Sequence, residues 1–188
     1  MSGVKAIQEF TAGELREYLA AGKADIESFY GQLLTYAHGV QERIHAFASL
    51  DDRVIQVHAG HLKSERARGE PLGRLYGVPI AVKDIIDTVD FPTAYGSPIH
   101  EGRYAVADAA VVRRLRDAGA VIFGKTVTTE FATFHPGPTR NPHNPEHTPG
   151  GSSSGSAAAV AAGVVPVALG TQTNGSMIPP AAFCGDKR

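Results

Sequence analysis

The chain has 188 residues, and its 18 basic and 19 acidic side chains give a formal net charge of -1. This length suits one domain, and the balanced charge argues against direct binding of nucleic acid, which favours a strongly basic surface. Hydrophobic residues make up 43% of the chain, which excludes a disordered chain that lacks apolar surface to bury. The single cysteine, Cys184, cannot form an internal disulfide and indicates a reducing compartment.

The apolar segments bear on where the protein is found. Residues 1–10 contain no apolar run, so we expect no secretory signal. The longest apolar stretch, residues 157–170, contains a Gly and a Pro and is shorter than the roughly 20 residues that cross a bilayer. We therefore expect a cytoplasmic protein with no membrane partner.

Three helices are expected in the first 70 residues, which would form a helical cover. Thr11 and Glu14 have the spacing of a capping box, in which each side chain bonds the backbone N–H of the other residue. Apolar residues then recur at spacings of three and four, as on one face of a helix. The expected helices span residues 11–21, 24–43 and 51–68.

From residue 71 onward the pattern changes to alternating strands and helices. Pro166 lies within the last apolar run and disfavours a central position for that strand, because proline cannot donate a ladder hydrogen bond. The alternation predicts an α/β core over residues 71–188, and we take the whole chain, 1–188, as a single domain. The expected strands span residues 76–82, 119–124 and 164–169, and the expected helices span residues 107–118 and 154–163.

Lys83 stands where the first apolar run of this core ends. The simpler interpretation is that it marks the exit of the strand into solvent. A half-buried lysine, in contrast, has a lowered pKa because desolvation disfavours its charged form, and its neutral amine can act as a general base. The residues alone leave both interpretations open.

A second feature is the Gly/Ser-rich segment of residues 148–156, which directly precedes an Ala-rich helix. It approaches the pattern of a phosphate-binding loop but lacks the lysine that such a loop requires. It also fits the G-x-S-x-G nucleophile elbow, with Ser153 as the nucleophile. That elbow follows a strand, whereas proline-rich residues precede this segment. The helix after it disfavours a flexible linker.

A third feature is the polar segment of residues 170–176, at the end of the last predicted strand. The carboxyl end of a strand is where α/β sheets place ligands, although a plain turn is the alternative. Residues 174–176 also match a glycosylation acceptor, which the expected cytoplasmic location disfavours.

Together these segments resemble the amidase signature family of serine hydrolases. The resemblance extends from about Thr11 to Gly185 and implies a mixed central sheet covered by helices. It implies a Ser–cis-Ser–Lys triad in which Ser176 is the nucleophile, Ser152 is the bridging serine after a cis peptide bond, and Lys83 is the base. It also implies an oxyanion hole made by the backbone N–H groups of Thr173, Asn174, Gly175 and Ser176. The segments that carry it are residues 77–84, 124–126, 130–132, 141–162 and 170–185.

The implied activity is hydrolysis of a small carboxamide through an acyl-enzyme, with no cofactor. A second interpretation is the A subunit of a tRNA-dependent amidotransferase, which works with partner subunits. A third, from another class, is a catalytically inactive remnant. No metal site is expected, because prolines around His143 and His147 prevent the two from sharing a helix face.

The sequence departs from the family pattern at the site and in length. Gln172 stands where the family often has Asp, Asn174 where it has Gly, and Ile178 and Pro179 where an Arg is common. Family members are usually more than twice as long. We therefore expect the fold to end after the nucleophile region. The chain would then be a truncated gene product, the product of a frameshift or an expressed fragment.

Such a fold would expose one edge of its sheet. An unpaired edge strand promotes association with other chains. We therefore expect either a homodimer or a partner chain that completes the sheet, and poor folding and little amide hydrolysis by the chain alone.

Overall fold

The computed structural model describes residues 7–185. Its amino-terminal part is helical, as the spacing of apolar residues predicts. Thr11 and Glu14 form the predicted capping box, and the carboxylates of Asp25 and Asp51 cap the next two helices by accepting backbone N–H groups. The elements are a 3-10 turn η1 (Ile7–Glu9) and the helices α1 (Ala12–Ala20), α2 (Ile26–Ile44) and α3 (Asp52–Ala67).

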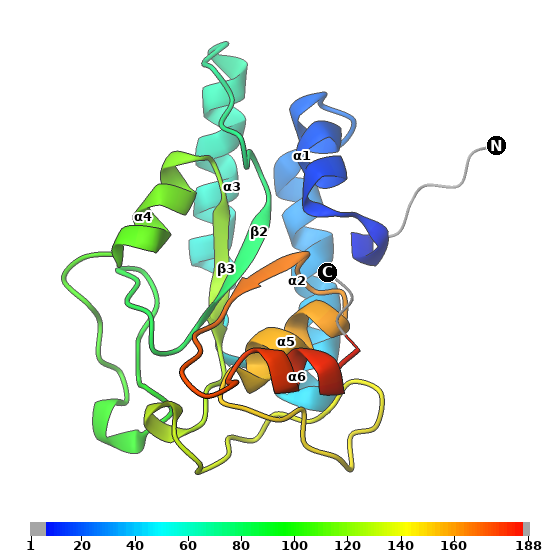
Figure 1. The fold of residues 1–188 in the computed structure, drawn as a ribbon. Helices are drawn as coiled ribbons and strands as arrows, with labels where there is room; N and C mark the ends of the chain where they lie inside the picture. Colours follow the sequence, from blue (N-terminus) through cyan, green and yellow to red (C-terminus); the bar gives the residue numbers. More distant parts are fainter. Residues whose placement is uncertain (1–6, 186–188) are drawn as a thin grey trace.

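The centre of the fold is a four-stranded mixed sheet with the strand order β1-β3-β2-β4 (Figure 1). β2 pairs in parallel with β3 on one side and with β4 on the other, whereas β1 is antiparallel to β3. The predicted α/β class and mixed sheet are therefore confirmed. The strands are β1 (Phe47–Ser49), β2 (Pro79–Lys83), β3 (Val121–Thr126) and β4 (Val167–Leu169).

The first and last strands differ most from the sequence expectation. β1 lies inside the part of the chain expected to be a purely helical cover, and its three residues are too short to show an alternating pattern. β4 begins directly after Pro166 and lies at the edge of the sheet. A proline next to an edge strand is tolerated, because a proline has no backbone N–H to donate to a neighbouring strand.

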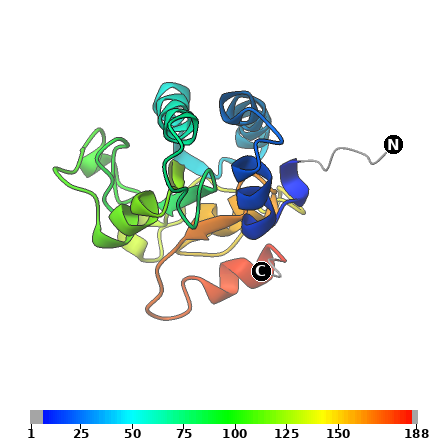
Figure 2. The same cartoon turned by 90° about the horizontal axis from the view of Figure 1, so that it is seen from above.

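Helices cover both faces of the sheet (Figure 2). α2 and α3 lie on one face, and α6 lies on the opposite side, beyond α5. Tyr30 of α2 is fully buried, and its hydroxyl donates a 2.9 Å hydrogen bond to the carbonyl of Gly77, just before β2. None of the helices within residues 7–185 is long and apolar enough to cross a membrane. The helical elements that follow β2 in the chain are α4 (Ala110–Asp117), α5 (Ser154–Ala161), α6 (Ile178–Phe183) and the 3-10 turns η2 (Pro98–His100) and η3 (Glu130–Ala132).

Small residues let α5 lie directly against the sheet. The Gly155 backbone N–H donates to the carbonyl of Val127 at 2.9 Å, and a side chain at Gly155 would collide with the Val127 backbone and the Ala46 carbonyl. The Ser156 hydroxyl contacts the Thr126 hydroxyl at 2.7 Å and donates to the Leu169 carbonyl at 3.0 Å. The first turn of α5 therefore joins β3 to β4 and fixes the loop that precedes the helix.

The close approach at Gly155 predicts a destabilising effect of adding one methyl group. We expect Gly155→Ala to lower the free energy of unfolding by about 1–3 kcal/mol or more, because backbone atoms on both sides must move. Gly13→Ala, in α1 with open space around it, is the matched control and should stabilise by about 0.5–1 kcal/mol. Urea unfolding monitored by circular dichroism measures both changes. Equal stabilities of the two variants would contradict the packing described here.

Candidate active site

The ammonium-bearing side chain of Lys83 is fully buried at the carboxyl end of β2. Its Nζ atom lies 2.7 Å from the Ser152 hydroxyl oxygen and 2.9 Å from the Thr171 hydroxyl oxygen. No carboxylate forms an ion pair with it among the residues described. Burial lowers the pKa of Lys83 to about 8, because the charged form loses its hydration. About a tenth of this amine is therefore neutral at pH 7 and about half at pH 8, far more than for an exposed lysine.

Ser152 is held beside Lys83 by the irregular backbone that precedes α5. The peptide bond between Gly151 and Ser152 is cis, and the Ser152 side chain is buried. The Ser152 carbonyl accepts a 3.1 Å hydrogen bond from the backbone N–H of Thr129, which follows β3. The segment before α5 thus places the hydroxyl of Ser152 against the amine of Lys83.

Ser176 lies on the loop that leads from β4 to α6 and is half-buried. Its carbonyl accepts a 3.0 Å hydrogen bond from the Ser153 backbone N–H, which ties the loop to the start of α5. In residues 7–185, no hydrogen bond joins the Ser176 hydroxyl to Ser152. The structure therefore brings Lys83 and Ser152 into direct contact and places Ser176 next to this pair through the backbone of Ser153.

Gln172 shapes the loop that carries Ser176. Its side-chain oxygen accepts hydrogen bonds from the backbone N–H groups of Met177 and Ile178, both at 3.1 Å. These contacts close the loop against the start of α6. Thr173 and Asn174 are exposed, and Gly175 has a φ of 90°, a left-handed conformation that glycine adopts without strain.

Comparison with known proteins shows the family to which the chain belongs. A family model described as Amidase matches residues 31–185. The chain belongs to the amidase signature family.

Curated relatives of this amidase-family chain include two bacterial proteins, each named as the A subunit of glutamyl-tRNA(Gln) amidotransferase. The one from Salinibacter ruber is 45% identical and is aligned to 93% of this chain and 35% of its own length. The one from Thermobifida fusca is 44% identical, over 94% of this chain and 37% of its own length. The chain thus spans little more than a third of these relatives.

Solved structures show the same fold. Native peptide amidase from Stenotrophomonas maltophilia superposes with a TM-score of 0.87 at 37% identity, covering 94% of this chain and 39% of that chain. A chain of a vestigial protein complex, described as revealing the origins of an s-triazine catabolic enzyme, gives a TM-score of 0.87 at 39% identity. It covers 94% of this chain and 40% of that chain.

Two polar residues of this candidate site do not stand out in the sequence. In the sequence, Thr171 is one of several polar residues after the last strand. In the structure, its hydroxyl contacts Lys83. In the sequence, Gln172 is noted only because it departs from the family pattern. In the structure, its side chain closes the loop that carries Ser176. Their position at the end of a strand is a signal, but the partner of each side chain depends on the tertiary fold.

A second buried lysine, Lys125, lies on β3 next to β2 and forms an ion pair with Asp84 at 3.3 Å. Asp84 also accepts the Ala94 backbone N–H at 3.2 Å, and Lys125 donates to the Pro92 carbonyl at 3.2 Å and to the Thr93 hydroxyl. Burial lowers the pKa of Lys125, and the Asp84 carboxylate opposes that shift. This pair fixes the loop after β2 and gives Lys125 the partner that Lys83 lacks.

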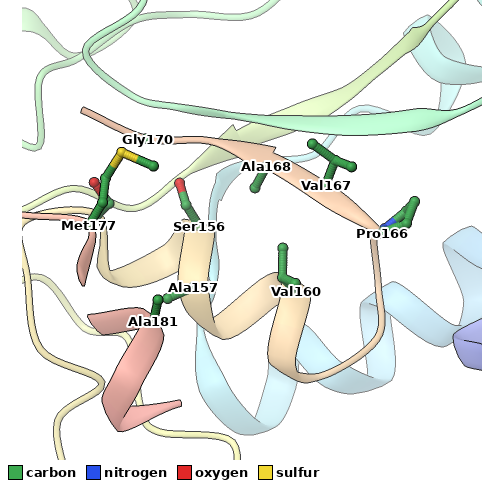
Figure 3. Close-up of a pocket in the computed structure, with 10 residues that line it drawn as sticks. Ser156, Ala157, Val160, Pro166, Val167, Ala168, Gly170, Met177 and Ala181 are labelled. Carbon is green, nitrogen blue, oxygen red and sulfur yellow. The ribbon is translucent and has the colours of Figure 1, made fainter. Parts of the chain in front are cut away.

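An apolar cavity of about 300 Å³ lies between α5, β4 and α6 (Figure 3). Ser156 and Val160 point from α5 toward β4, and Met177 lies beside Gly170 at the end nearest Ser176. The candidate site thus has an apolar chamber next to the loop that carries Ser176. The walls are formed by Ser153, Ser156, Ala157, Val160, Pro166, Val167, Ala168, Gly170, Met177 and Ala181.

The lowered pKa of Lys83 predicts a pH-dependent stability. The unfolded chain binds this proton up to the ordinary pKa of 10.5, whereas the folded chain releases it above about pH 8. Between these values the unfolded state binds more protons, so the free energy of unfolding rises with pH, by up to about 3 kcal/mol in total.

Urea unfolding between pH 7 and pH 10.5 tests this expectation. Lys83→Met should remove the share of the rise that Lys83 contributes, while the share of Lys125 remains, and Lys23→Met, at an exposed lysine, should keep the whole rise. A difference in stability between the wild type and Lys83→Met that does not change with pH would show that Lys83 titrates normally.

Proposed function

We propose that this chain carries the catalytic centre of an amidase that hydrolyses a carboxamide C–N bond through a serine acyl-enzyme. The observation that supports it most is the buried 2.7 Å contact between the Lys83 amine and the Ser152 hydroxyl. This amine is buried, forms no ion pair with a carboxylate of the described residues, and has a pKa of about 8. These are the properties of a general base.

The proposed reaction begins with the neutral amine of Lys83. Lys83 takes the proton of the Ser152 hydroxyl, Ser152 takes that of Ser176, and the Ser176 oxygen attacks the amide carbonyl carbon. The C=O π bond opens, and its electron pair moves onto oxygen, where the backbone N–H groups of Thr173, Asn174, Gly175 and Ser176 would stabilise it. The electron pair on oxygen then re-forms the C=O bond as the C–N bond breaks, and the nitrogen leaves with the proton that Lys83 returns through Ser152. Water hydrolyses the acyl-enzyme by the same relay.

A second candidate is an amidotransferase A subunit, favoured by the names of the relatives. In that role the same acyl-enzyme would release ammonia from glutamine for a second reaction elsewhere in an assembly. Comparing ammonia release from glutamine with that from simple amides discriminates the two. Preference for glutamine supports the amidotransferase, and preference for apolar amides supports a hydrolase that uses the chamber beside Met177.

We also propose that a further polypeptide segment covers the free edge of β4. β4 pairs with β2 on one side only, and Val167 at its start is 38% exposed. Apolar side chains of the adjoining loop and α6 are exposed as well, including Met177, Ile178 and Phe183. An unpaired strand beside an apolar surface favours pairing with a strand from a second copy or a partner chain.

The nucleophile is identified by covalent labelling. A fluorophosphonate probe should modify Ser176, and peptide mass spectrometry locates the adduct. Ser176→Ala should abolish labelling, and Lys83→Ala should slow it by about 10²- to 10⁴-fold, as for a lost acid/base group. Ser64→Ala, at an exposed serine of α3, is the control and should label normally. An adduct on Ser153 with Ser176 unmodified would favour the nucleophile-elbow interpretation instead.

The β4 edge is tested by a charge placed on it. When the chain is studied alone, we expect it to self-associate, and we expect Val167→Lys to weaken this association because a lysine at an edge strand opposes pairing. Val106→Lys, at a fully exposed valine away from the sheet, should leave it unchanged. Light scattering coupled to size-exclusion chromatography measures the masses. A wild-type monomer, or equal masses for wild type and Val167→Lys, would contradict pairing of this edge with a second copy of the chain.

A further inference from the structure

In the described part of the chain, three oxygen atoms lie within hydrogen-bond distance of the Lys83 amine, and Thr171 supplies two of them. Lys83 Nζ lies 2.9 Å from the Thr171 hydroxyl oxygen and 3.5 Å from the Thr171 carbonyl oxygen. The third oxygen is the hydroxyl of Ser152 at 2.7 Å. One residue outside the proposed triad therefore makes most of the contacts of the proposed base.

The number of protons on the amine decides what this arrangement does. A neutral amine has two N–H donors and one lone pair, whereas the charged form has three donors and no lone pair. The Thr171 carbonyl can only accept a hydrogen bond, and the Thr171 hydroxyl can accept the other N–H. The lone pair then has only the third direction left, which is that of the Ser152 hydroxyl.

We propose that Thr171 is a positioning residue whose hydroxyl and carbonyl oxygens hold the two N–H groups of neutral Lys83 and aim its lone pair at the Ser152 hydroxyl. This inference rests on the proposed function, since it assigns a role relative to Lys83 as the base. In the proposed reaction Thr171 itself takes up no proton and forms no bond to the substrate. Its effect on the reaction passes through the orientation of Lys83.

The backbone of Thr171 is itself fixed by Ser153. The Ser153 hydroxyl donates to the Thr171 carbonyl at 3.2 Å and accepts the Thr171 backbone N–H at 3.3 Å. A side chain at Gly170 would approach the Ser153 oxygen to 2.9 Å, so this pairing needs a glycine before Thr171. The Ser153 backbone N–H also donates to the Ser176 carbonyl. Ser153 therefore fixes the positions of both Thr171 and the loop that carries Ser176.

No charged group within residues 7–185 competes with Thr171 for the Lys83 amine. The β3 residue paired with Lys83 is Thr126, whose hydroxyl is bonded to Ser156 of α5. The neighbouring acid, Asp84, is bonded to Lys125 and to the Ala94 backbone. Neutral oxygens alone therefore set the direction of the amine, which makes the loss of one of them measurable.

The experiment compares Thr171→Val, which keeps the shape but removes the hydroxyl, with Thr171→Ser, which keeps the hydroxyl. Thr35→Val, on the exposed surface of α2, is the matched control. Two quantities are measured on the whole chain. The first is the rate of fluorophosphonate labelling of Ser176 against pH, and the second is the pKa of Lys83 from the ¹⁵N chemical shift of its Nζ.

We expect Thr171→Val to lower the high-pH plateau of the labelling rate by about 10- to 100-fold, as for a misaligned catalytic group. It should also move the pKa of Lys83 below about 8, because a lost acceptor disfavours the charged form. More of the amine is then neutral at neutral pH, yet labelling is slower. A purely structural role would not produce this combination. Thr171→Ser should restore both quantities to wild-type values.

Unchanged plateau rate and pKa in Thr171→Val would overturn the inference, and so would a Thr171→Ser variant as slow as Thr171→Val. If Thr171→Val does not fold, Thr171→Ser still tests the inference, since any large change in its plateau rate contradicts a role carried by the hydroxyl. Labelling that survives in Ser176→Ala would refute the proposed function instead. In that case the ¹⁵N titration still decides whether Thr171 holds the Lys83 amine.

Discussion

The buried amine of Lys83 is the constraint on which the rest of this site depends. An ammonium group taken out of water loses several kcal/mol of hydration unless charges or hydrogen bonds replace it. Here the replacement is only partial, because neutral oxygens of Ser152 and Thr171 surround it. The strand that ends at Lys83 is buried at every position and pairs on both sides, so the side chain cannot escape to solvent. The tension between burial and charge is what lowers the pKa of Lys83.

Small residues around the start of α5 reconcile this buried amine with a stable fold. Gly155 lets the helix touch the backbone after β3, and Ser156 links β3 to β4 through its hydroxyl. Larger side chains would push the helix away from the sheet, and Ser152 would lose contact with Lys83. The Gly/Ser-rich composition of this segment is therefore required by packing as well as by chemistry, which explains why it resembles both a linker and a nucleophile elbow.

The sequence predicted the elements that have strong local signals and missed those that depend on distant partners. The capping box at Thr11 and the apolar runs of β2 and β3 are local, and the structure has them where expected. β1 is too short to carry a pattern and exists because it pairs with β3. The contact between Lys83 and Ser152 followed from the family resemblance, since 69 residues separate them. The contact with Thr171 is invisible in the sequence because it depends on the register between β2 and β4.

The two buried lysines of the sheet show why only one suits the role of a base. Lys83 and Lys125 lie on neighbouring strands, both are fully buried, and burial lowers the pKa of each. Lys125 has the Asp84 carboxylate at 3.3 Å, which favours its charged form and ties it to the loop after β2. Within residues 7–185, Lys83 is bonded to hydroxyl and carbonyl oxygens alone, which can hold either protonation state. The feature that separates the ion-paired lysine of this fold from the proposed base is thus a single neighbouring carboxylate.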